Sequence, residues 1–428
     1  MYIESLRILS QFPIENIWML AVDGKFYEKE GPLGFENREK GSVQAVLNAL
    51  LESLQKLGEP LSVADIQRIH TRCMTDVPSR NPCTPGQFRT NNVAFEVLSN
   101  WCTPKGLEDL LRNKPNTAQL IPSELAFVND GYVPLSSVKD KANLKLAFDP
   151  DKALAKNCSE SDLQSLHAKL AQGDARLVYQ PPEASKLEQQ LAIILRIYNS
   201  NINQANTDDE KILLIAELIQ RCTRLHPFRD GNNRTFVNCL ANRLLIENGL
   251  CPVLLFEPNI FEFHTPTELV SVLKDAQQQF MSRIQAPETP IFNYDNSKIG
   301  LIEDGKFVSM GRDFKQRFSA LIYKLAQQQY SKKNYLLASE YFQINYELEK
   351  QINDKSTNSG ISLFSLALSL KQLGQLQLAR THFSNTVGLF NSLHKQKALI
   401  NKAEKHIKEI DVMLSSLEEK NTETAQAN

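Results

Sequence analysis

The sequence predicts a mainly α-helical protein with two separate helical regions. Apolar residues recur at three- and four-residue spacing through most long segments of the 428-residue chain. Patterns typical of strands are confined to short stretches beside glycine-containing turns. After Phe314 the composition changes to leucine, alanine, glutamine and lysine, with no further cysteine. A chain of this length, 42% hydrophobic and 23% charged, can form two or three domains with buried cores.

The helices of the first region lie between recognisable start and stop signals. Thr207 and Ser62 are N-cap residues, and Asn248-Gly249 is a C-cap signal. Two tight hairpins around Asp-Gly pairs are expected within residues 17–28 and 299–310. The expected helices are residues 41–57, 62–73, 105–112, 161–171, 184–202, 207–224, 234–247 and 266–284.

The composition excludes several classes of protein. The formal net charge is −1 and no basic block occurs, so nucleic acid is not expected as a partner. Charged residues interrupt the N-terminal stretch and no apolar run reaches membrane length, so we expect neither a signal peptide nor an integral membrane segment. The seven cysteines form no CxxC pair, which favours reduced thiols and a cytoplasmic protein.

A turn between two expected helices carries chemistry. Residues 225–235 read Leu-His-Pro-Phe-Arg-Asp-Gly-Asn-Asn-Arg-Thr. Backbone N–H groups of residues 231–233, at the start of the second helix, form a concavity that suits a phosphate. Arg234 adds a cationic fork, and Asp230 can hold Mg²⁺ against a diphosphate. His226 can take a proton near neutral pH. These groups together indicate phosphoryl or nucleotidyl transfer.

This turn resembles the signature of the Fic (filamentation induced by cAMP) family, HxFx(D/E)GNxR. The resemblance implies a Fic-type helical catalytic domain that attaches part of a nucleotide donor to a Ser, Thr or Tyr hydroxyl of a protein substrate. His70 lies in a segment that resembles an early helix of these domains, and we expect it to be structural. The residues to which the resemblance assigns a role are His226 (general base), Asp230 (Mg²⁺ ligand), Gly231, Asn232 and Asn233 (cradle of the transferred phosphate), Arg234 (ligand of the leaving phosphate) and Phe228 (structural anchor).

A second segment, residues 84–95, also resembles the family. Its Pro-Gly turn and the alternation that follows predict a hairpin edge. In Fic proteins a Gly-x-(Tyr/Phe)-Arg segment opens a flap that docks the target by strand addition, which would make Gly86, Phe88 and Arg89 docking residues. Residues 96–176 look inserted in this flap region, and at that length we expect a lid or a specificity subdomain near the nucleotide.

Two departures from the family pattern bear on the donor. Many Fic enzymes have a second arginine three residues after the first, where this chain has Val237, and a glycine where this chain has Asn233. The missing arginine removes a contact to a γ-phosphate, and the Asn233 side chain can crowd the transferred phosphate. Self-restraining members carry a (Ser/Thr)xxxE(Gly/Asn) helix whose glutamate pairs with the second arginine. We expect no such switch here.

Three functions therefore compete. The first is AMPylation, in which a protein adenylyltransferase moves AMP from ATP to its target, because this activity is common in the family. The second is phosphocholine transfer from CDP-choline to a host protein, favoured by Val237 and by the insertion. The third is an inactive nucleotide-binding scaffold that acts through its helical repeats, favoured by Asn233. Expected targets of the first two activities are a host GTPase or another signalling protein.

The second helical region contains an internal repeat with an offset of 41 residues, at Ala326/Ala367, Tyr335/Leu376, Ala338/Ala379 and Phe342/Phe383. Small residues at helix contacts and aromatic residues between them resemble tetratricopeptide (TPR) helix pairs, which would bind a protein partner. An ordinary helical bundle is the alternative. The polar tail resembles export signals of bacterial type IV systems, which would deliver an effector into a host cell. The expected boundaries are 1–290 (catalytic domain), 291–313 (linker with hairpin), 314–417 (TPR-like module, closed by a helix at 396–417) and 418–428 (disordered tail).

Overall fold

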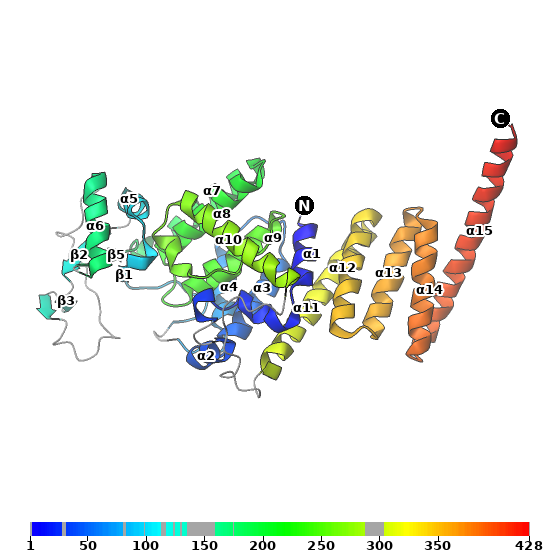
Figure 1. The fold of residues 1–428 in the computed structure, drawn as a ribbon, viewed down its shortest axis with the longest axis horizontal. Coiled ribbons are helices and arrows are strands. Elements are labelled where there is room, and N and C mark those ends of the chain that lie inside the picture. The colour runs from blue at the N-terminus through cyan, green and yellow to red at the C-terminus, as the bar shows by residue number, and fades with distance from the viewer. Residues whose placement is uncertain are drawn as a thin grey trace. The chain divides into compact units, whose positions relative to one another are not determined.

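The computed structural model describes residues 2–27, 31–79, 83–97, 99–112, 117–122, 125–128, 131–134, 159–173, 175–286 and 304–427. These residues are mainly helical, which confirms the predicted fold class, and they form two compact units (Figure 1). Residues 16–307 are called the loop unit here because they contain the turn at 225–235. Residues 1–15 and 308–428 form the other, the repeat unit. Among the described helices, none combines the length and the apolar character that a membrane crossing requires.

The loop unit is organised around α8 (Asp208–Leu225). Thr207 begins this helix with a capping box, in which its side chain accepts from the N–H of Glu210, as the sequence predicts. The apolar face of α8 is at most 2% exposed at Ile212, Ile215, Ala216, Ile219 and Cys222. The other helices of this unit are α2 (Gly31–Arg38), α3 (Ser42–Leu54), α4 (Val63–Met74), α5 (Pro104–Arg112), α6 (Glu160–Gln172), α7 (Leu187–Asn201), α9 (Ala241–Glu247) and α10 (Pro266–Gln285).

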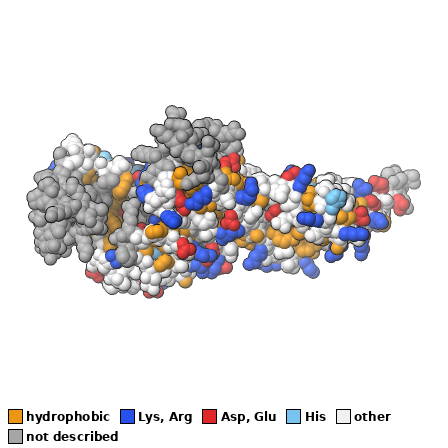
Figure 2. Space-filling model, turned by 90° about the horizontal axis from the view of Figure 1, so that it is seen from below, with side chains coloured by type: hydrophobic (Ala, Val, Ile, Leu, Met, Phe, Trp, Pro, Cys, Tyr) orange, Lys and Arg blue, Asp and Glu red, His pale blue; other side chains and the backbone are white. Residues whose placement is uncertain are grey.

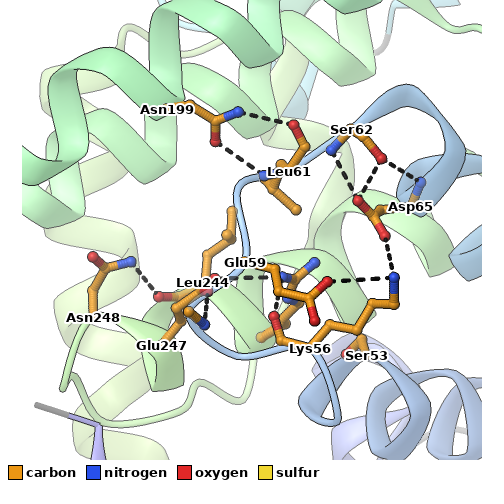
Figure 3. Close-up of polar contacts among 12 residues, drawn as sticks. Ser53, Lys56, Glu59, Leu61, Ser62, Asp65, Asn199, Leu244, Glu247 and Asn248 are labelled. Carbon is orange, nitrogen blue, oxygen red and sulfur yellow. Dashed lines mark hydrogen bonds and ion pairs between the residues drawn. The ribbon is translucent and has the colours of Figure 1, made fainter.

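Polar side chains fix the loop between α3 and α4 against α7 and α9 (Figure 3). Asn199 on α7 donates to the carbonyl of Leu61 at 2.8 Å and accepts from its N–H at 3.1 Å. Glu247 on α9 accepts from the N–H of Gly58 at 2.6 Å. These bonds satisfy backbone groups of the loop, so the start of α4 is held in one position relative to α7 and α9.

The helix predicted from Arg234 is present, but it begins differently from an ordinary α-helix. Residues Arg234–Leu240 form a π-helical segment that continues into α9. The helix ends before Gly249, whose φ of 80° is the left-handed stop that the Asn-Gly pair predicts. The π-helical segment was not predicted, and such segments recur at functional sites.

Neither predicted hairpin is found in the described residues. Residues Ile14–Leu20 and Gly24–Phe26 form 3₁₀ turns, and the N–H of Gly24 donates to the carbonyl of Leu255 at 2.8 Å. The Asp-Gly pair therefore binds a segment far away in the sequence instead of closing a hairpin. The other predicted hairpin is wrong from residue 304 onward, where α11 (Asp304–Ser331) begins, and its first part lies outside the described residues.

The insertion forms a small subdomain. Its strands β1 (Phe95–Val97), β5 (Ala175–Gln180) and β2 (Thr117–Pro122) pair antiparallel in the order β1-β5-β2, and β3 (Leu125–Val128) pairs with β4 (Gly131–Pro134). Helices α5 and α6 match the two helices that the sequence predicts there. A core cluster joins the subdomain to the rest of the loop unit through Leu107, Leu110, Leu163, Leu166, Leu170, Tyr179 and Phe263.

The repeat unit confirms the predicted period. Its helices are α1 (Ile3–Gln11), most of α11, α12 (Tyr335–Asn353), α13 (Thr357–Gln372), α14 (Leu376–Ser392) and α15 (Lys397–Ala427). The four repeat alanines are fully buried, and Phe342 and Phe383 are at most 3% exposed. Lys333 (φ 61°) and Gly374 (φ 75°) lie 41 positions apart and make the same left-handed turn between helices.

The ends of this unit differ from the predicted boundaries. Residues 1–15 pack with the C-terminal helices instead of the catalytic domain, and Lys315 donates to Gln351 at 2.8 Å and to the carbonyl of Ser10. The predicted disordered tail continues α15 as far as Ala427. The tail contains no glycine or proline, so nothing local ends the helix there.

Candidate active site

The turn at residues 225–235 lines a cavity of about 460 Å³ in the loop unit. His226 ends α8 in the left-handed conformation (φ 46°), which redirects the chain away from the helix axis. Gly231 has φ 72°, and a Cβ there would lie 2.4 Å from Sδ of Met74. Only glycine fits this position without displacing a neighbour. The turn therefore has its shape because of both local conformation and packing.

His226 has one ring nitrogen without a partner. Its side chain is 15% exposed, and its ring centroid lies 3.9 Å from that of Phe95. The Nδ1 atom is buried and makes no hydrogen bond, and it lies 3.9 Å from Oε1 of Glu262. Burial, aided by the charge of Arg89, lowers the pKa of His226 to about 3. The imidazole is therefore neutral near pH 7 and free to accept a proton.

Glu262 is a buried carboxylate beside this histidine, and the sequence analysis missed it. It accepts a hydrogen bond from the hydroxyl of Tyr179, and its backbone carbonyl accepts from Nε of Arg224 at 2.7 Å. Burial raises the pKa of Glu262 to about 7, although Tyr179 and Arg224 both favour the charged form. The available signal in the sequence is an acid between two aromatic residues, Phe261 and Phe263, which are both buried.

His70 and Phe228 form the floor beneath the turn. Their rings stack with centroids 3.7 Å apart and an interplanar angle of 7°. Nδ1 of His70 accepts from the N–H of Gly86 at 2.8 Å, so Nε2 carries the proton and donates to the carbonyl of Asp230 at 3.0 Å. Both nitrogens of a fully buried ring are thus satisfied, which confirms the structural role predicted for His70.

Asn232 closes the turn on itself. Its Nδ2 donates to the carbonyl of Phe228 at 2.8 Å, and its Oδ1 accepts from the N–H of the same residue at 3.1 Å. The side chain is therefore used inside the protein. Its backbone N–H is at the start of a helix, where such groups have no partner within the helix and can bind an anion.

Arg89 braces the turn from inside. It is 4% exposed, its N–H donates to the carbonyl of Pro227 at 2.9 Å, and its Nε donates to the carbonyl of His226 at 2.8 Å. A third bond runs to the carbonyl of Pro182. The Arg89 side chain donates to backbone carbonyls of this chain, and its place in a target-docking flap stays a prediction.

The other two predicted docking residues also lie under the turn. A Cβ on Gly86, which has φ 81°, would lie 2.3 Å from Oγ1 of Thr71, and the ring of Phe88 packs 5.4 Å from that of Phe228. Strand β1 follows them, and the order β1-β5-β2 makes it an edge strand among the described residues. In the predicted flap, β1 is therefore the strand with an edge open to strand addition, and the role of these three residues in docking stays a prediction.

Two hydrogen bonds orient the carboxylate of Asp230, the predicted Mg²⁺ ligand. Its Oδ1 accepts from the N–H of Gly231 at 2.7 Å, and its Oδ2 accepts from the hydroxyl of Ser79 at 2.9 Å. Within the described ranges, no group of three or more His, Cys, Asp or Glu residues could hold a metal ion by itself. One oriented carboxylate combined with donor phosphates is a usual environment for Mg²⁺, so Asp230 fits that ion.

Asn233 does not crowd the turn in the way that its size suggests. Its Nδ2 donates to Oδ1 of Asn259 at 2.9 Å, and Asn259 in turn donates to Glu257 at 2.7 Å. Glu257 is paired with Lys25 at 2.7 Å. This chain of bonds holds the amide against the cavity wall. Val237 is fully buried, so it supplies no group to a phosphate.

Arg234 is paired with Glu39, which was not among the predicted site residues. Its Nη2 lies 2.8 Å from Oε2 of Glu39, and its Nη1 lies 2.9 Å from Sδ of Met74. The two charged side chains are 12% and 20% exposed. Glu39 thus reaches the site although it does not belong to a (Ser/Thr)xxxE(Gly/Asn) helix. It pairs with Arg234, the first arginine of the family pattern, and not with a second one. A donor phosphate must share Arg234 with Glu39 or displace it.

Aromatic and acidic side chains line the remainder of the cavity. The aromatic residues are Phe35, Phe95, Trp101 and Phe263, and the acids beside Asp230 are Asp23, Glu39 and Glu262. Burial raises the pKa of Asp23 to about 6. Trp101 comes from the insertion, which therefore contributes directly to the cavity wall.

Comparison with known proteins agrees with this geometry. The sequence pattern of the "Fic/DOC family" matches residues 157–243, a range that includes the whole turn. The chain is also similar to "Phosphocholine transferase AnkX" of Legionella pneumophila, with 34% identity over 325 residues. The similar region is 71% of this chain and 32% of that relative, so this chain spans about a third of the relative's length. The turn, the helices around it and these matches together show that residues 157–243 of this chain contain a domain of the Fic/DOC family.

Proposed function

We propose that this protein transfers phosphocholine from CDP-choline to a hydroxyl group of a target protein. The observation that carries the proposal is one cavity that combines a phosphate-binding turn with aromatic and acidic side chains. Its volume of about 460 Å³ suits a small ligand. The similarity to a phosphocholine transferase supports the same donor.

The residues of the turn divide the reaction between them. His226 accepts the proton of the target hydroxyl while that oxygen forms a bond to the choline-bearing phosphorus. The bond between this phosphorus and the bridging oxygen breaks, and CMP leaves with the electron pair. Backbone N–H groups after Gly231 bind the oxygens of the transferred phosphate, and Arg234 binds the leaving phosphate. Mg²⁺ held by Asp230 would neutralise charge on the diphosphate.

The cavity lining suits both ends of CDP-choline. The aromatic faces of Phe35, Phe95 and Trp101 can stack on a cytosine ring or contact a quaternary ammonium group. Asp23 adds negative charge, which favours the positive trimethylammonium group of choline, whereas the charge of Glu39 is paired with Arg234. A triphosphate would meet these same acids without the arginine that Val237 replaces. For this reason AMP transfer from ATP, the first expectation from the sequence, becomes the second candidate.

The target is proposed to be a protein of a host cell, such as a signalling GTPase, with this chain acting as a delivered effector. Strand β1 would hold an extended target segment beside His226, because the Phe95 ring lies against that histidine. The repeat unit would hold a protein partner. Figure 2 shows hydrophobic side chains gathered on one face of the C-terminal helices beside lysines and arginines. Leu336 and Leu378 are among the exposed apolar residues of this unit.

Two labelled donors test the proposal. Full-length protein is incubated with a host cell lysate and either CDP-choline labelled in the choline group or ATP labelled at the α-phosphate. We expect a labelled protein band with CDP-choline, and none with His226→Ala. The matched control is His394→Asn, an exposed histidine in the repeat unit with φ 50°, which asparagine tolerates. Label from ATP alone, or equal labelling by His226→Ala, would reject the proposal.

A further inference from the structure

We propose that Glu262, held by Tyr179, is a positioning residue that orients His226 and stabilises its imidazolium form during transfer. This inference rests on the proposed function, because it assigns the proton acceptor to His226. It adds a residue that lies outside the turn.

Glu262 lies beside the ring nitrogen of His226 that has no hydrogen-bond partner. Nδ1 of His226 is buried without a hydrogen bond, and the carboxylate Oε1 of Glu262 lies 3.9 Å from it. This distance exceeds a hydrogen bond by about 1 Å, which a small movement of either side chain closes. The ring also lines the cavity, so Nε2 is the nitrogen available to a hydroxyl. A carboxylate on the opposite nitrogen fixes the tautomer with the proton on Nδ1.

Hydrogen bonds from Tyr179 and Arg224 hold Glu262 in place. Tyr179 on β5 donates its hydroxyl to Oε2, which leaves Oε1 directed to His226. Nε of Arg224 on α8 donates to the backbone carbonyl of Glu262, and the charge of this arginine acts on the carboxylate. Nη1 of Arg224 pairs with Asp109 on α5 at 2.6 Å. The carboxylate therefore has one oxygen in a fixed bond and one facing the proposed base.

Glu262 also bears on the charge balance during the reaction. When Nε2 takes the proton of the hydroxyl, the ring becomes a cation in a site where burial and Arg89 both disfavour that charge. Nδ1–H of the cation then faces an anion, because Glu262 is ionised above its pKa of about 7. No proton moves to Glu262. The proton stays on Nε2 of His226 and is released to solvent after CMP has departed.

This arrangement predicts an unusual pH profile. The pKa of His226 is about 3, so its protonation does not limit the rate between pH 5 and pH 9. The pKa of Glu262 is about 7, so the anion is lost as the pH falls through 7 and kcat/KM should fall with it. The groups that face Glu262 are His226, Tyr179 and Arg224, and the last two stabilise its charged form.

Three substitutions test the inference in the full-length protein with labelled CDP-choline. Glu262→Gln should lower kcat/KM at pH 8 by about 10²- to 10³-fold and abolish the fall near pH 7. Glu262→Asp keeps the anion and should restore part of the rate together with the fall. Tyr179→Phe removes a bond that favours the charged form, so the fall should move to higher pH.

A buried glutamate elsewhere supplies the control. Glu349 in the repeat unit is 7% exposed and also accepts a hydroxyl bond, from Ser319. Glu349→Gln should leave both the rate and the pH profile unchanged. A wild-type profile in Glu262→Gln, or an equal loss in Glu349→Gln, overturns the inference while the proposed function stands. If His226→Ala retains activity, the proposed function fails as well.

A second measurement does not depend on turnover. In protein labelled with ¹⁵N-histidine, the His226 signals are identified by their absence in His226→Ala. Their chemical shifts should show the proton on Nδ1 at pH 8 and should move with a midpoint near pH 7 as Glu262 titrates. Glu262→Gln should show no such step. A proton on Nε2 at pH 8, or a step that survives Glu262→Gln, contradicts the inference even if no donor is accepted.

Discussion

His70, which packs against the turn, and His226, which is part of it, differ in the hydrogen bonding of their ring nitrogens. Each ring packs against a phenylalanine, at 3.7 Å for His70 on Phe228 and 3.9 Å for His226 on Phe95. Burial lowers the pKa of both, to about 4 and about 3. His70 has both nitrogens bonded, whereas His226 has a buried nitrogen with no partner. Burial and a lowered pKa alone therefore do not identify a catalytic histidine.

The unsatisfied nitrogen is the informative difference. A buried polar atom without a partner destabilises the folded state by about 1–3 kcal/mol, so such atoms are few and need an explanation. At His70 the bonds to Gly86 and Asp230 fix the floor of the turn. At His226 the buried nitrogen faces the carboxylate of Glu262 at 3.9 Å, which is too far for a hydrogen bond in this structure. The ring nitrogens of His70 are thus both bonded in the structure, whereas the proposed role of His226 requires its buried nitrogen to gain a partner during the reaction.

The largest expected effect comes from His226→Ala. Loss of the base should lower the transfer rate by about 10²- to 10⁴-fold. The free energy of unfolding should change by less than about 1 kcal/mol, because the lost packing on Phe95 is offset by removal of the unpartnered nitrogen. Initial-rate assays and urea unfolding measure the two quantities. A large loss of stability with a proportional loss of activity would make His226 a second structural histidine.

His70→Phe should show the reverse. The new ring can still stack on Phe228, but the N–H of Gly86 and the carbonyl of Asp230 lose their partners. The free energy of unfolding should fall by about 2–4 kcal/mol, measured from the midpoint of urea unfolding at constant slope. His394→Asn, in the repeat unit, is the control for histidine loss. An unchanged midpoint would show that these two hydrogen bonds do not hold the turn.

Glu262→Gln tests the surroundings of His226 through the free energy of unfolding instead of the transfer rate. The folded-state pKa of Glu262, about 7, is above the ordinary 4.5, so the folded protein binds more protons than the unfolded chain between these values. The stability of the wild type therefore falls as the pH rises from 4.5 to 7. Glutamine does not titrate and still accepts from Tyr179. The variant should equal the wild type near pH 4 and exceed it by about 2–3 kcal/mol at pH 8.

Urea unfolding of both proteins at pH 4 and pH 8 measures this difference. Glu349→Gln controls for removal of a buried carboxylate that accepts a bond from a hydroxyl. A variant that is both more stable and less active at pH 8 would show that Glu262 is retained for function. Equal stability of variant and wild type at pH 8 would mean that the carboxylate is not destabilised by its surroundings.

Features encoded within one turn of a helix could be predicted from the sequence. Ser62 and Thr207 cap α4 and α8 as expected, and the structure shows each cap as a capping box, whose interacting groups are three residues apart. The repeat was also readable, since its period repeats small residues at each helix contact. The turn at 225–235 was recognisable because its polar groups are contiguous in sequence.

Features that depend on distant segments could not be predicted. The Asp-Gly pair at 23–24 has the pattern of a hairpin, but the N–H of Gly24 donates to the carbonyl of Leu255. No local pattern predicts that Leu255 lies there. Arg89 was expected to help dock a target, yet two of the carbonyls that it binds belong to the turn more than a hundred positions away. Glu39 lies 195 positions before Arg234. In all three cases the residue contacts a segment that is far away in the sequence, which a local pattern does not reveal.

The smallest expected effect concerns Glu39. Its pair with Arg234 competes with the leaving phosphate of the donor, so Glu39→Gln should bind the donor more tightly. Both side chains are partly exposed, and such pairs contribute up to about 1 kcal/mol, which corresponds to a two- to sixfold lower Kd. Calorimetry with CDP-choline on the His226→Ala background measures binding without turnover. Arg380→Gln, which breaks an exposed pair with Asp411 in the repeat unit, is the control. Weaker binding in Glu39→Gln would mean that this acid holds Arg234 in its working position, in the way that His70 holds the floor.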